Sequence, residues 1–485
     1  MAWTLSRQRR ARADDLDRAV LAFNRLGDGI TWRDLMTSCV VLGDTGSGKS
    51  SILRVLAAAA MRGGASLVCF AVKPGDAAGY ADLARRCGRT DVEVFRPLET
   101  PFNPLRNAQR RWHGTLGQHE KLVELVMDPV RQLHQGSSGD APFWSALAED
   151  RAAHVLTLAL LSGTPLSFRW VFECVRALPR SPREAADPAW QRSSPACVAL
   201  SAALERELTT SQRADLDRAG TWLLSDACRT PEKTAASIEA SLNGPLSQLV
   251  RGEIGDVLNH PDASWSPCGV VDRPGVLVLD CSTQVYGPLG RVMQRLIKRE
   301  LLDALRTRDL TRASHPVLLV QDEMQELIDP KGDPEAMRTL RDRWAAVVGA
   351  TQCVSNVVMA CGEARDPHAV AAALLGLAGI KVFCSSTDPE TLRFAEQAMT
   401  STPQVSATLG KSERGGRGEP GRAGGTDRST SLAIEMRPDV PGYQIARLRR
   451  GGPANGMVVE AFVTAGGRVF RGSRTTSIKV AFRQI

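Results

Sequence analysis

Short runs of consecutive apolar residues, each followed by a stretch with helical periodicity, occur in the first hundred residues and again after about residue 275. Uninterrupted apolar runs of this length indicate strands that are buried on both faces. The expected strands are Cys39–Leu42, Ser66–Val72, Val92–Phe95, Gly275–Asp280, Val317–Gln321, Ala345–Ala350 and Gly379–Cys384. Their alternation with helices predicts an α/β fold, in which helices cover both faces of a mainly parallel sheet.

The pattern changes in the middle and near the end of the chain. Residues 114–248 show helical periodicity without a convincing strand, interrupted by a Pro- and Ser-rich stretch at 178–195, so an all-α insertion domain is expected. Residues 401–431 are rich in Gly, Arg and Ser, and we expect them to be mobile because they bury too little apolar surface to offset ordering entropy. Met457–Val463 and Gly467–Arg471 predict a closing β-hairpin.

The first apolar strand runs directly into a glycine-rich loop that a helix follows. This loop, GDTGSGKS, satisfies the pattern GxxxxGK[ST] between a strand and a helix, which is the context that a phosphate-binding P-loop requires. Glycines let backbone N–H groups curl around phosphate oxygens, and the helix N-terminus adds its dipole. Lys49 is expected to reach the β- and γ-phosphates of ATP, and the Ser50 hydroxyl to bind Mg²⁺. The expected nucleotide-binding residues are Gly43, Asp44, Thr45, Gly46, Ser47, Gly48, Lys49, Ser50 and Ser51.

A P-loop needs a carboxylate on a nearby strand, and the run Val317–Gln321 ends in two acids. We assign Asp322 to Mg²⁺ and Glu323 to polarising the attacking water, because ligands bind at the carboxyl edge of such sheets. Asp280 also follows an apolar run, but no Glu comes after it, so it is interpreted as an ordinary strand end.

Two further features lie beside the strand Ala345–Ala350. Gln352 follows this strand and is a candidate for reporting the state of the γ-phosphate, although a solvated loop glutamine is an equal alternative. Arg338, Arg341 and Arg343 precede the strand, and one of them is a candidate arginine finger that acts on a neighbouring subunit.

The order of these elements resembles the FtsK and HerA class of P-loop ATPases, most closely the coupling proteins of type IV secretion and conjugation. Only the two Walker elements are individually specific, but the resemblance extends over about residues 35–471. The motifs that carry it are Val72–Gly75, Phe102–Leu105, Phe143–Trp144, Asp322–Glu323 and Ala350–Gln352.

The resemblance implies a ring, expected to be a hexamer, in which ATP hydrolysis drives DNA through a central channel. It implies that the all-α insertion faces a relaxase, relaxosome or secretion substrate, and that Arg341 is the best-placed finger. Two features depart from the family: Ala71 stands where an acid often precedes the Lys turn, and no transmembrane hairpin is expected before the P-loop. The chain is therefore interpreted as a coupling protein recruited by a membrane partner, a cytosolic translocase of another system, or a module whose anchor is a separate protein.

These patterns divide the chain into six segments. They are a basic lead at 1–38, the first part of the nucleotide-binding domain at 39–113, the all-α insertion at 114–248, the second part at 249–400, the mobile segment at 401–431, and a closing β-hairpin region at 432–485.

Composition and charge refine the picture only slightly. The content of 43% hydrophobic and 24% charged residues excludes disorder throughout the chain, and the net charge of +8 favours an acidic partner such as DNA. The apolar runs are too short to cross a bilayer, and the scattered cysteines indicate reduced thiols, so a cytoplasmic location is expected, with peripheral recruitment to the membrane. The basic residues within Arg7–Arg12 either contact phosphate groups or form a solvated tail.

The same sequence features are compatible with two other functions. A nucleotide-gated module that recruits relaxase or effector proteins without pumping DNA has the same nucleotide site. An unrelated P-loop enzyme such as a kinase has little support, because no acceptor site is evident.

Overall fold

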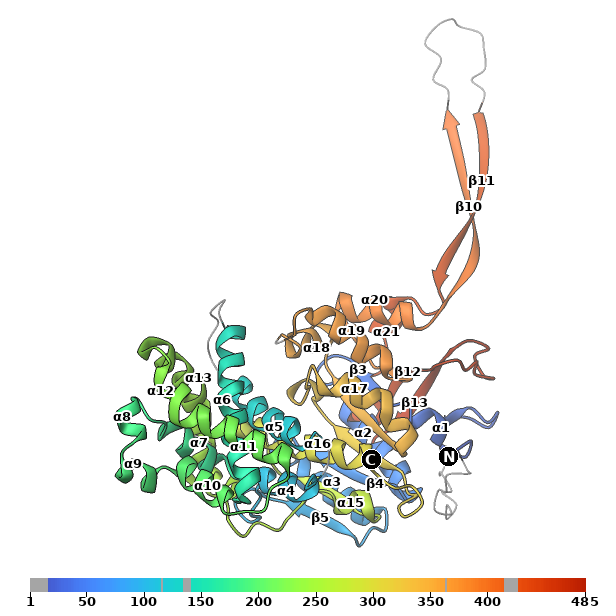
Figure 1. The fold of residues 1–485 in the computed structure, drawn as a ribbon. Helices are drawn as coiled ribbons and strands as arrows, with labels where there is room; N and C mark the ends of the chain where they lie inside the picture. The colour runs from blue at the N-terminus through green and yellow to red at the C-terminus, as the bar shows by residue number, and fades with distance from the viewer. Residues whose placement is uncertain (1–15, 115–116, 134–140, 363, 414–425) are drawn as a thin grey trace, which may run out of the picture. The chain divides into compact units, whose positions relative to one another are not determined.

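The computed structural model describes residues 16–114, 117–133, 141–362, 364–413 and 426–485 (Figure 1). The first 15 residues of the basic lead, including Arg7–Arg12, and the centre of the 401–431 segment therefore lie outside the described residues. The chain divides into two compact units, one formed by Met1–Gly63 with Leu318–Ile485 and the other by Gly64–Val317. Each unit is described by itself below.

The main sheet has nine strands, and the predicted α/β class is confirmed. Its order is β13-β12-β9-β3-β8-β7-β4-β6-β5. The bounds are β3 Cys39–Leu42, β4 Ser66–Phe70, β5 Val92–Phe95, β6 Val276–Leu279, β7 Val317–Gln321, β8 Ala345–Thr351, β9 Ile380–Phe383, β12 Val458–Ala465 and β13 Ser477–Arg483.

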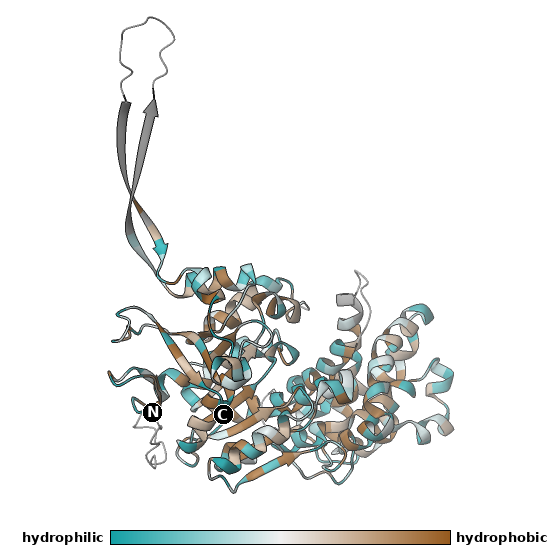
Figure 2. Cartoon of the chain, turned by 180° about the vertical axis from the view of Figure 1, so that it is seen from behind, coloured by the Kyte–Doolittle hydropathy of each residue, from teal (hydrophilic) through white to brown (hydrophobic). Residues whose placement is uncertain are grey.

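In the first unit, β3 pairs in parallel with β8 and β9, whereas β12 runs antiparallel to both β9 and β13. All four residues of β3 are buried, as expected for a central strand covered on both faces. The strands of the sheet are coloured mainly brown in Figure 2, which follows from their apolar composition. The structural position of the glycine-rich loop is therefore fixed by a fully buried strand.

Helices and short turns complete the first unit. One apolar cluster packs helices α18, α19, α20 and α21 against β3 and β9, through residues such as Val357, Leu374 and Phe383. Helices α19 and α20 each begin with an Asp–Pro pair, whose aspartate side chain caps the first turn. The bounds are β1 Ala19–Ala22, β2 Gly29–Thr31, α1 Trp32–Leu35, α2 Lys49–Arg62, η2 Met324–Glu326, α17 Gly332–Thr339, η3 Leu340–Arg343, α18 Val354–Ala360, α19 Pro367–Leu377, α20 Pro389–Ala398, α21 Gly442–Ala446 and η4 Pro453–Asn455.

The closing hairpin differs from the sequence prediction in its second strand. The prediction of a strand at Gly467–Arg471 is wrong, because the strand that pairs with β12 is β13, at Ser477–Arg483. Phe470 is fully buried, and its ring lies 6.4 Å from that of Phe23 between ring centroids. The buried Phe470 side chain therefore anchors a turn, and the apolar residues at this position do not form a strand.

A long two-stranded ribbon interrupts the first unit between α20 and α21. Strands β10 (Ser401–Glu413) and β11 (Thr426–Pro438) pair antiparallel over their whole length and extend away from the helices beside them (Figure 1). The sequence prediction placed no strands in 401–431 and is corrected for the parts of that range that β10 and β11 occupy. Cross-strand pairing satisfies the backbone groups here without a large apolar core, which composition alone does not reveal.

The second unit combines three strands, β4, β6 and β5, with a large helical region. Strand β6 pairs in parallel with both of its neighbours. Between β5 and β6 the described residues contain helices and no strand, as the predicted all-α insertion requires. The bounds are α3 Asp76–Arg86, α4 Pro104–Arg111, α5 Gln118–Leu133, α6 Ala141–Ser162, α7 Phe168–Arg176, α8 Pro182–Ala185, α9 Pro188–Ser193, α10 Pro195–Leu204, α11 Thr210–Thr221, η1 Trp222–Asp226, α12 Ala227–Arg229, α13 Glu232–Val250, α14 Gly252–Leu258, α15 Gly269–Asp272 and α16 Thr283–Arg306.

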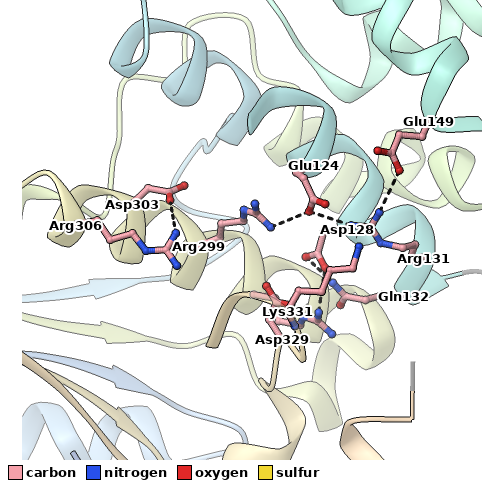
Figure 3. A network of polar contacts seen from close by, with 11 residues as sticks. Glu124, Asp128, Arg131, Gln132, Glu149, Arg299, Asp303, Arg306, Asp329 and Lys331 are labelled. Carbon is pink, nitrogen blue, oxygen red and sulfur yellow. Dashed lines mark hydrogen bonds and ion pairs between the residues drawn. The ribbon is translucent and has the colours of Figure 1, made fainter. Parts of the chain in front are cut away.

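Ion pairs, one of them buried, join helices α5 and α16 within the second unit. Arg295 on α16 donates to Asp128 on α5 over 3.0 Å, and each side chain is 8% exposed. Glu124, one turn before Asp128, accepts from Arg299 at 3.4 Å and from Arg131 at 3.1 Å (Figure 3). Removing either Arg295 or Asp128 would leave an uncompensated buried charge, so this pair holds the two helices in register.

His315 makes the stability of the second unit depend on pH. Its Nε2 lies 3.0 Å from the Val270 carbonyl, and its Nδ1 lies 3.1 Å from the Arg308 guanidinium. Burial, assisted by the charge of Arg308, lowers the pKa of His315 from 6.5 to about 4. The imidazole therefore stays neutral in the folded chain at a pH at which the unfolded chain is protonated.

The free energy of unfolding is expected to fall by about 3 kcal/mol as the pH falls from about 6.5 to about 4, because the unfolded state binds the extra proton. Urea unfolding of the wild type and of His315→Gln at several pH values measures this effect. The variant should show a shallower dependence in that window, and identical slopes for the two proteins would contradict the assignment.

Among the described residues, no helix combines the length and the apolar content that a membrane crossing demands.

Candidate nucleotide site

The glycine-rich loop connects β3 to α2 in the first unit. Gly46 and Gly48 have φ angles of 74° and 96°, the left-handed region that glycine adopts without strain. A side chain at Gly48 would also collide with β12, because its Cβ would lie 2.4 Å from Val459 Cγ2. Both requirements explain why this position of the loop is glycine.

Lys49 folds back over the loop that precedes it. It is 6% exposed, and its Nζ donates to the carbonyl oxygens of Gly43 at 2.7 Å and Asp44 at 3.0 Å. Ser50 and Ser51 follow in the first turn of α2, where backbone N–H groups point out of the helix end. Of the other expected loop residues, Ser47 is buried and Thr45 is exposed. The loop therefore has the curled shape and the positive charge that a phosphate site needs.

Asp322 and Glu323 directly follow β7, and their side chains are buried, with 3% and 7% exposure. Asp322 Oδ1 has no hydrogen-bond partner among the described residues, although it is shielded from solvent. Glu323 adopts a left-handed backbone conformation, with φ 60° and ψ 55°, that residues other than glycine rarely adopt. Strain of this kind concentrates at functional positions, where surrounding contacts maintain it.

Gln352 lies next to Glu323. Its Nε2 is 3.5 Å from both carboxylate oxygens of Glu323, and Gln325 donates to Oε2 of the same carboxylate at 2.8 Å. Strand β8, which Gln352 follows, pairs in parallel with β3 so that Thr351 is opposite Leu42. The ends of β3, β7 and β8 therefore meet at one edge of the sheet, and the loop, the two acids and the glutamine come together there.

The remaining predicted positions lie elsewhere. Asp280 follows β6 in the second unit, where its carboxylate lies 3.6 Å from Arg96. Arg341 is exposed in η3, before β8 begins, and lines a cavity of about 230 Å³ with Arg33 and Trp344. The seven residues of β8 span about 20 Å, so Arg341 lies at the sheet edge opposite Gln352. Arg341 is thus not part of the site in its own chain.

Sequence reasoning missed the groups that hold the other side of the loop. The Asp44 carboxylate accepts from the Ser386 hydroxyl at 3.0 Å, from Thr387 Oγ1 at 3.0 Å and from Arg450 Nη2 at 3.2 Å. Ser386 and Thr387 follow β9, so the rule that found Asp322 at the end of its strand also points to them. Arg450 carries no such signal, because it is 406 residues from Asp44 and precedes a strand.

The residues present fit magnesium and a nucleoside triphosphate. Mg²⁺ in phosphate-binding sites is held by few protein oxygens, with waters and phosphates completing the octahedron. In the described ranges, no cluster of three or more His, Cys, Asp or Glu side chains suited to a metal occurs. The free Asp322 oxygen, the Ser50 hydroxyl and the Lys49 ammonium supply what a Mg-nucleotide needs at this edge.

The fold and the geometry of this edge define the chain as having the P-loop NTPase fold. Among solved structures, it is similar to the bacterial conjugative coupling protein TrwBdeltaN70 in an unbound form, with a TM-score of 0.61 and 16% identity over 97% of this chain and 90% of that one. The plasmid coupling protein TrwB with the ATP analogue ADPNP gives a TM-score of 0.60 and 16% identity over 99% and 94% of the two chains. TrwB with ADP and Mg²⁺ gives 0.58 and 15% over 98% and 92%. At this identity the likeness establishes the shared fold.

No protein-family model and no curated protein matches the sequence.

Proposed function

We propose that this chain is an ATP-driven DNA translocase, a coupling ATPase that delivers DNA to a type IV secretion or conjugation-like system. The observation that carries the proposal is the meeting of Lys49, Glu323 and Gln352 at one edge of the sheet. The fold likeness to TrwB supports the coupling role, and TrwB has been solved with ADPNP and with ADP and Mg²⁺. The net charge of +8 favours a polyanionic substrate.

Each residue at the edge has a distinct task in this proposal. The loop amides and Lys49 bind the β- and γ-phosphates, while Ser50 and Asp322 hold Mg²⁺, which offsets phosphate charge when bound. Glu323 orients and polarises the attacking water, because its carboxylate is positioned by Gln325 and Gln352. Gln352 also connects the site to β8, so a change at the γ-phosphate shifts a strand of the central sheet.

The working form in this proposal is a hexameric ring in the cytoplasm, recruited peripherally to the membrane by a partner. The position of Arg341 is compatible with a ring, because its side chain is exposed at the sheet edge opposite the site of its own chain. A neighbouring subunit could therefore contact it. In a ring it would enter the site of the neighbouring subunit and stabilise charge on the phosphoryl group. Relaxase or secretion-channel proteins are the proposed partners of the helical insertion.

The test is the ATPase rate of the purified chain with and without single- and double-stranded DNA. DNA is expected to stimulate the rate, and the stimulation should weaken steeply between about 50 mM and about 200 mM salt, because phosphate contacts release counterions. Lys49→Ala is the control for contaminating ATPases. A rate that no DNA changes would reject the translocase and leave a nucleotide-gated recruitment module, for which tight nucleotide binding with negligible turnover is expected.

A further inference from the structure

The ribbon formed by β10 and β11 has an exposed apolar face. Ile434 and Met436 are 76% and 65% exposed, and they stand two residues apart on β11, so they share one face of the strand. Pro403, which pairs with Met436, is exposed as well. Val405 pairs with Ile434, so the same alternation of positions continues along β10. Adjoining exposed apolar residues of this kind mark interaction surfaces, whereas scattered ones are ordinary.

The opposite face of the ribbon is polar. Thr402 and Arg437 pair across the two strands, and both are exposed. The two strands together contain three basic and three acidic residues, which are Lys411, Arg428, Arg437, Glu413, Asp427 and Glu435. This balance gives the two strands no net attraction to a polyanion such as DNA or to anionic lipid headgroups. The apolar face therefore fits a protein surface whose charges are also balanced.

The backbone at the base of the ribbon is strained. Thr400 has a φ of 55°, which is an outlier for a β-branched residue. Its hydroxyl donates to Asp439 Oδ2 at 2.7 Å and lies 3.0 Å from Thr476 Oγ1, and its carbonyl accepts from the Asp439 amide at 3.1 Å. These contacts tie the two ends of the ribbon to each other and to the residue before β13. The direction in which the ribbon leaves α20 is thereby fixed at a cost in backbone energy, as expected of a segment that must meet a surface at a defined place.

The dimensions of the ribbon indicate which surface covers it. A two-stranded ribbon alone is at best marginally stable in water, so burial of its apolar face is favourable. Strands of 13 residues span about 40 Å, and they extend away from the helices beside them (Figure 1). A second copy of this chain carries a ribbon of the same length, with the same apolar positions and the same balanced charge. Two such ribbons can bury their apolar faces against each other while their polar faces stay in water.

We propose that the apolar face of the β10–β11 ribbon packs against the ribbon of a second copy of this chain. The contact is face to face, because Pro403 has no N–H to offer to a strand added at the edge of β10. One face of two such strands covers about 400 Å², about half of what a stable interface buries per partner, so the ribbon adds to other contacts between subunits. The inference deepens the ring of the proposed function, and it rests on that proposal only for the number of copies.

The experiment measures self-association of the full chain by sedimentation equilibrium over a range of concentrations. The double variant Ile434→Ser with Met436→Ser is expected to raise the dissociation constant at least about 100-fold, because two apolar side chains lose their burial between copies. Both side chains are exposed in the single chain, so thermal unfolding of the dissociated chain should not change. A photo-crosslinking residue at position 434 of the otherwise unchanged chain should give covalent dimers.

The double variant Met359→Ser with Val469→Ser is the matched control, because these side chains are 78% and 64% exposed in the same unit but outside the ribbon. It should leave the dissociation constant unchanged. A ribbon variant that associates like the wild type would overturn the inference and leave the ring itself standing. A wild type that is monomeric at every concentration and binds vesicles of neutral phospholipid through Ile434 and Met436 would overturn it in favour of a membrane contact. DNA-stimulated ATPase activity of the same samples tests the translocase separately.

Discussion

Glu323→Gln is expected to lower the rate of ATP hydrolysis by about 10²- to 10⁴-fold, which is the range that a positioned general base contributes. The change keeps the size of the side chain and one oxygen that can accept from Gln325 and Gln352, but the neutral amide no longer polarises the attacking water. ATP binding should be retained, because Lys49 and the loop amides are untouched. Single-turnover hydrolysis and calorimetric ATP binding measure the two quantities separately.

Glu326→Gln is the matched control for this variant, because it makes the same charge change in the adjoining turn η2. It should hydrolyse ATP at close to the wild-type rate. If Glu323→Gln kept more than about a tenth of the wild-type rate, the assignment of Glu323 as the hydrolytic acid would be wrong.

Arg341→Ala is expected to lower DNA-stimulated hydrolysis by about 10³-fold or more, the effect of losing an arginine finger. Arg341 lies about 20 Å from Gln352 along β8, so the substitution does not directly alter the nucleotide site of the same chain. The loss should therefore appear only in the assembled protein, and ATP binding to the isolated chain should be unaffected. Arg338→Ala, on the preceding helix, is the matched control and should stay active.

Mixing the two inactive variants tests whether the arginine acts between subunits. An Arg341→Ala subunit supplies an intact Glu323, and a Glu323→Gln neighbour supplies an intact Arg341, so some interfaces in a mixed ring contain both groups. Partial recovery of activity on mixing is the expected result. If no mixture is more active than either variant alone, the arginine does not act across an interface.

Sequence patterns were sufficient for the groups that follow a buried strand. The residues of the P-loop are consecutive in the sequence, so the motif can be recognised directly. Asp322, Glu323 and Gln352 each follow an apolar run whose end must lie at the sheet edge. Contacts between distant segments left no such signal. Arg450 reaches Asp44 across 406 residues, and Gln484 reaches Ser51 across 433.

Two strand predictions show the limit of pattern reasoning in the C-terminal part. A short apolar alternation at Gly467–Arg471 looked like a strand, but the burial of Phe470 in a turn accounts for it. Strands β10 and β11 went unseen because their composition is largely polar and they flank a Gly- and Arg-rich stretch, and their register depends on pairing with each other. In both cases the outcome was decided by tertiary or cross-strand contacts and not by local propensity.

The backbone conformation of Glu323 lowers the stability of the folded chain, whereas its carboxylate is needed for ATP hydrolysis in the proposed function. A glutamate held at φ 60° raises the free energy of the folded chain by about 1 kcal/mol or more relative to glycine at that position. Any engineering scheme that ranks substitutions by conformational preference alone would choose glycine there and so discard the carboxylate. Thermostabilised versions of this chain should therefore be selected with this position held constant.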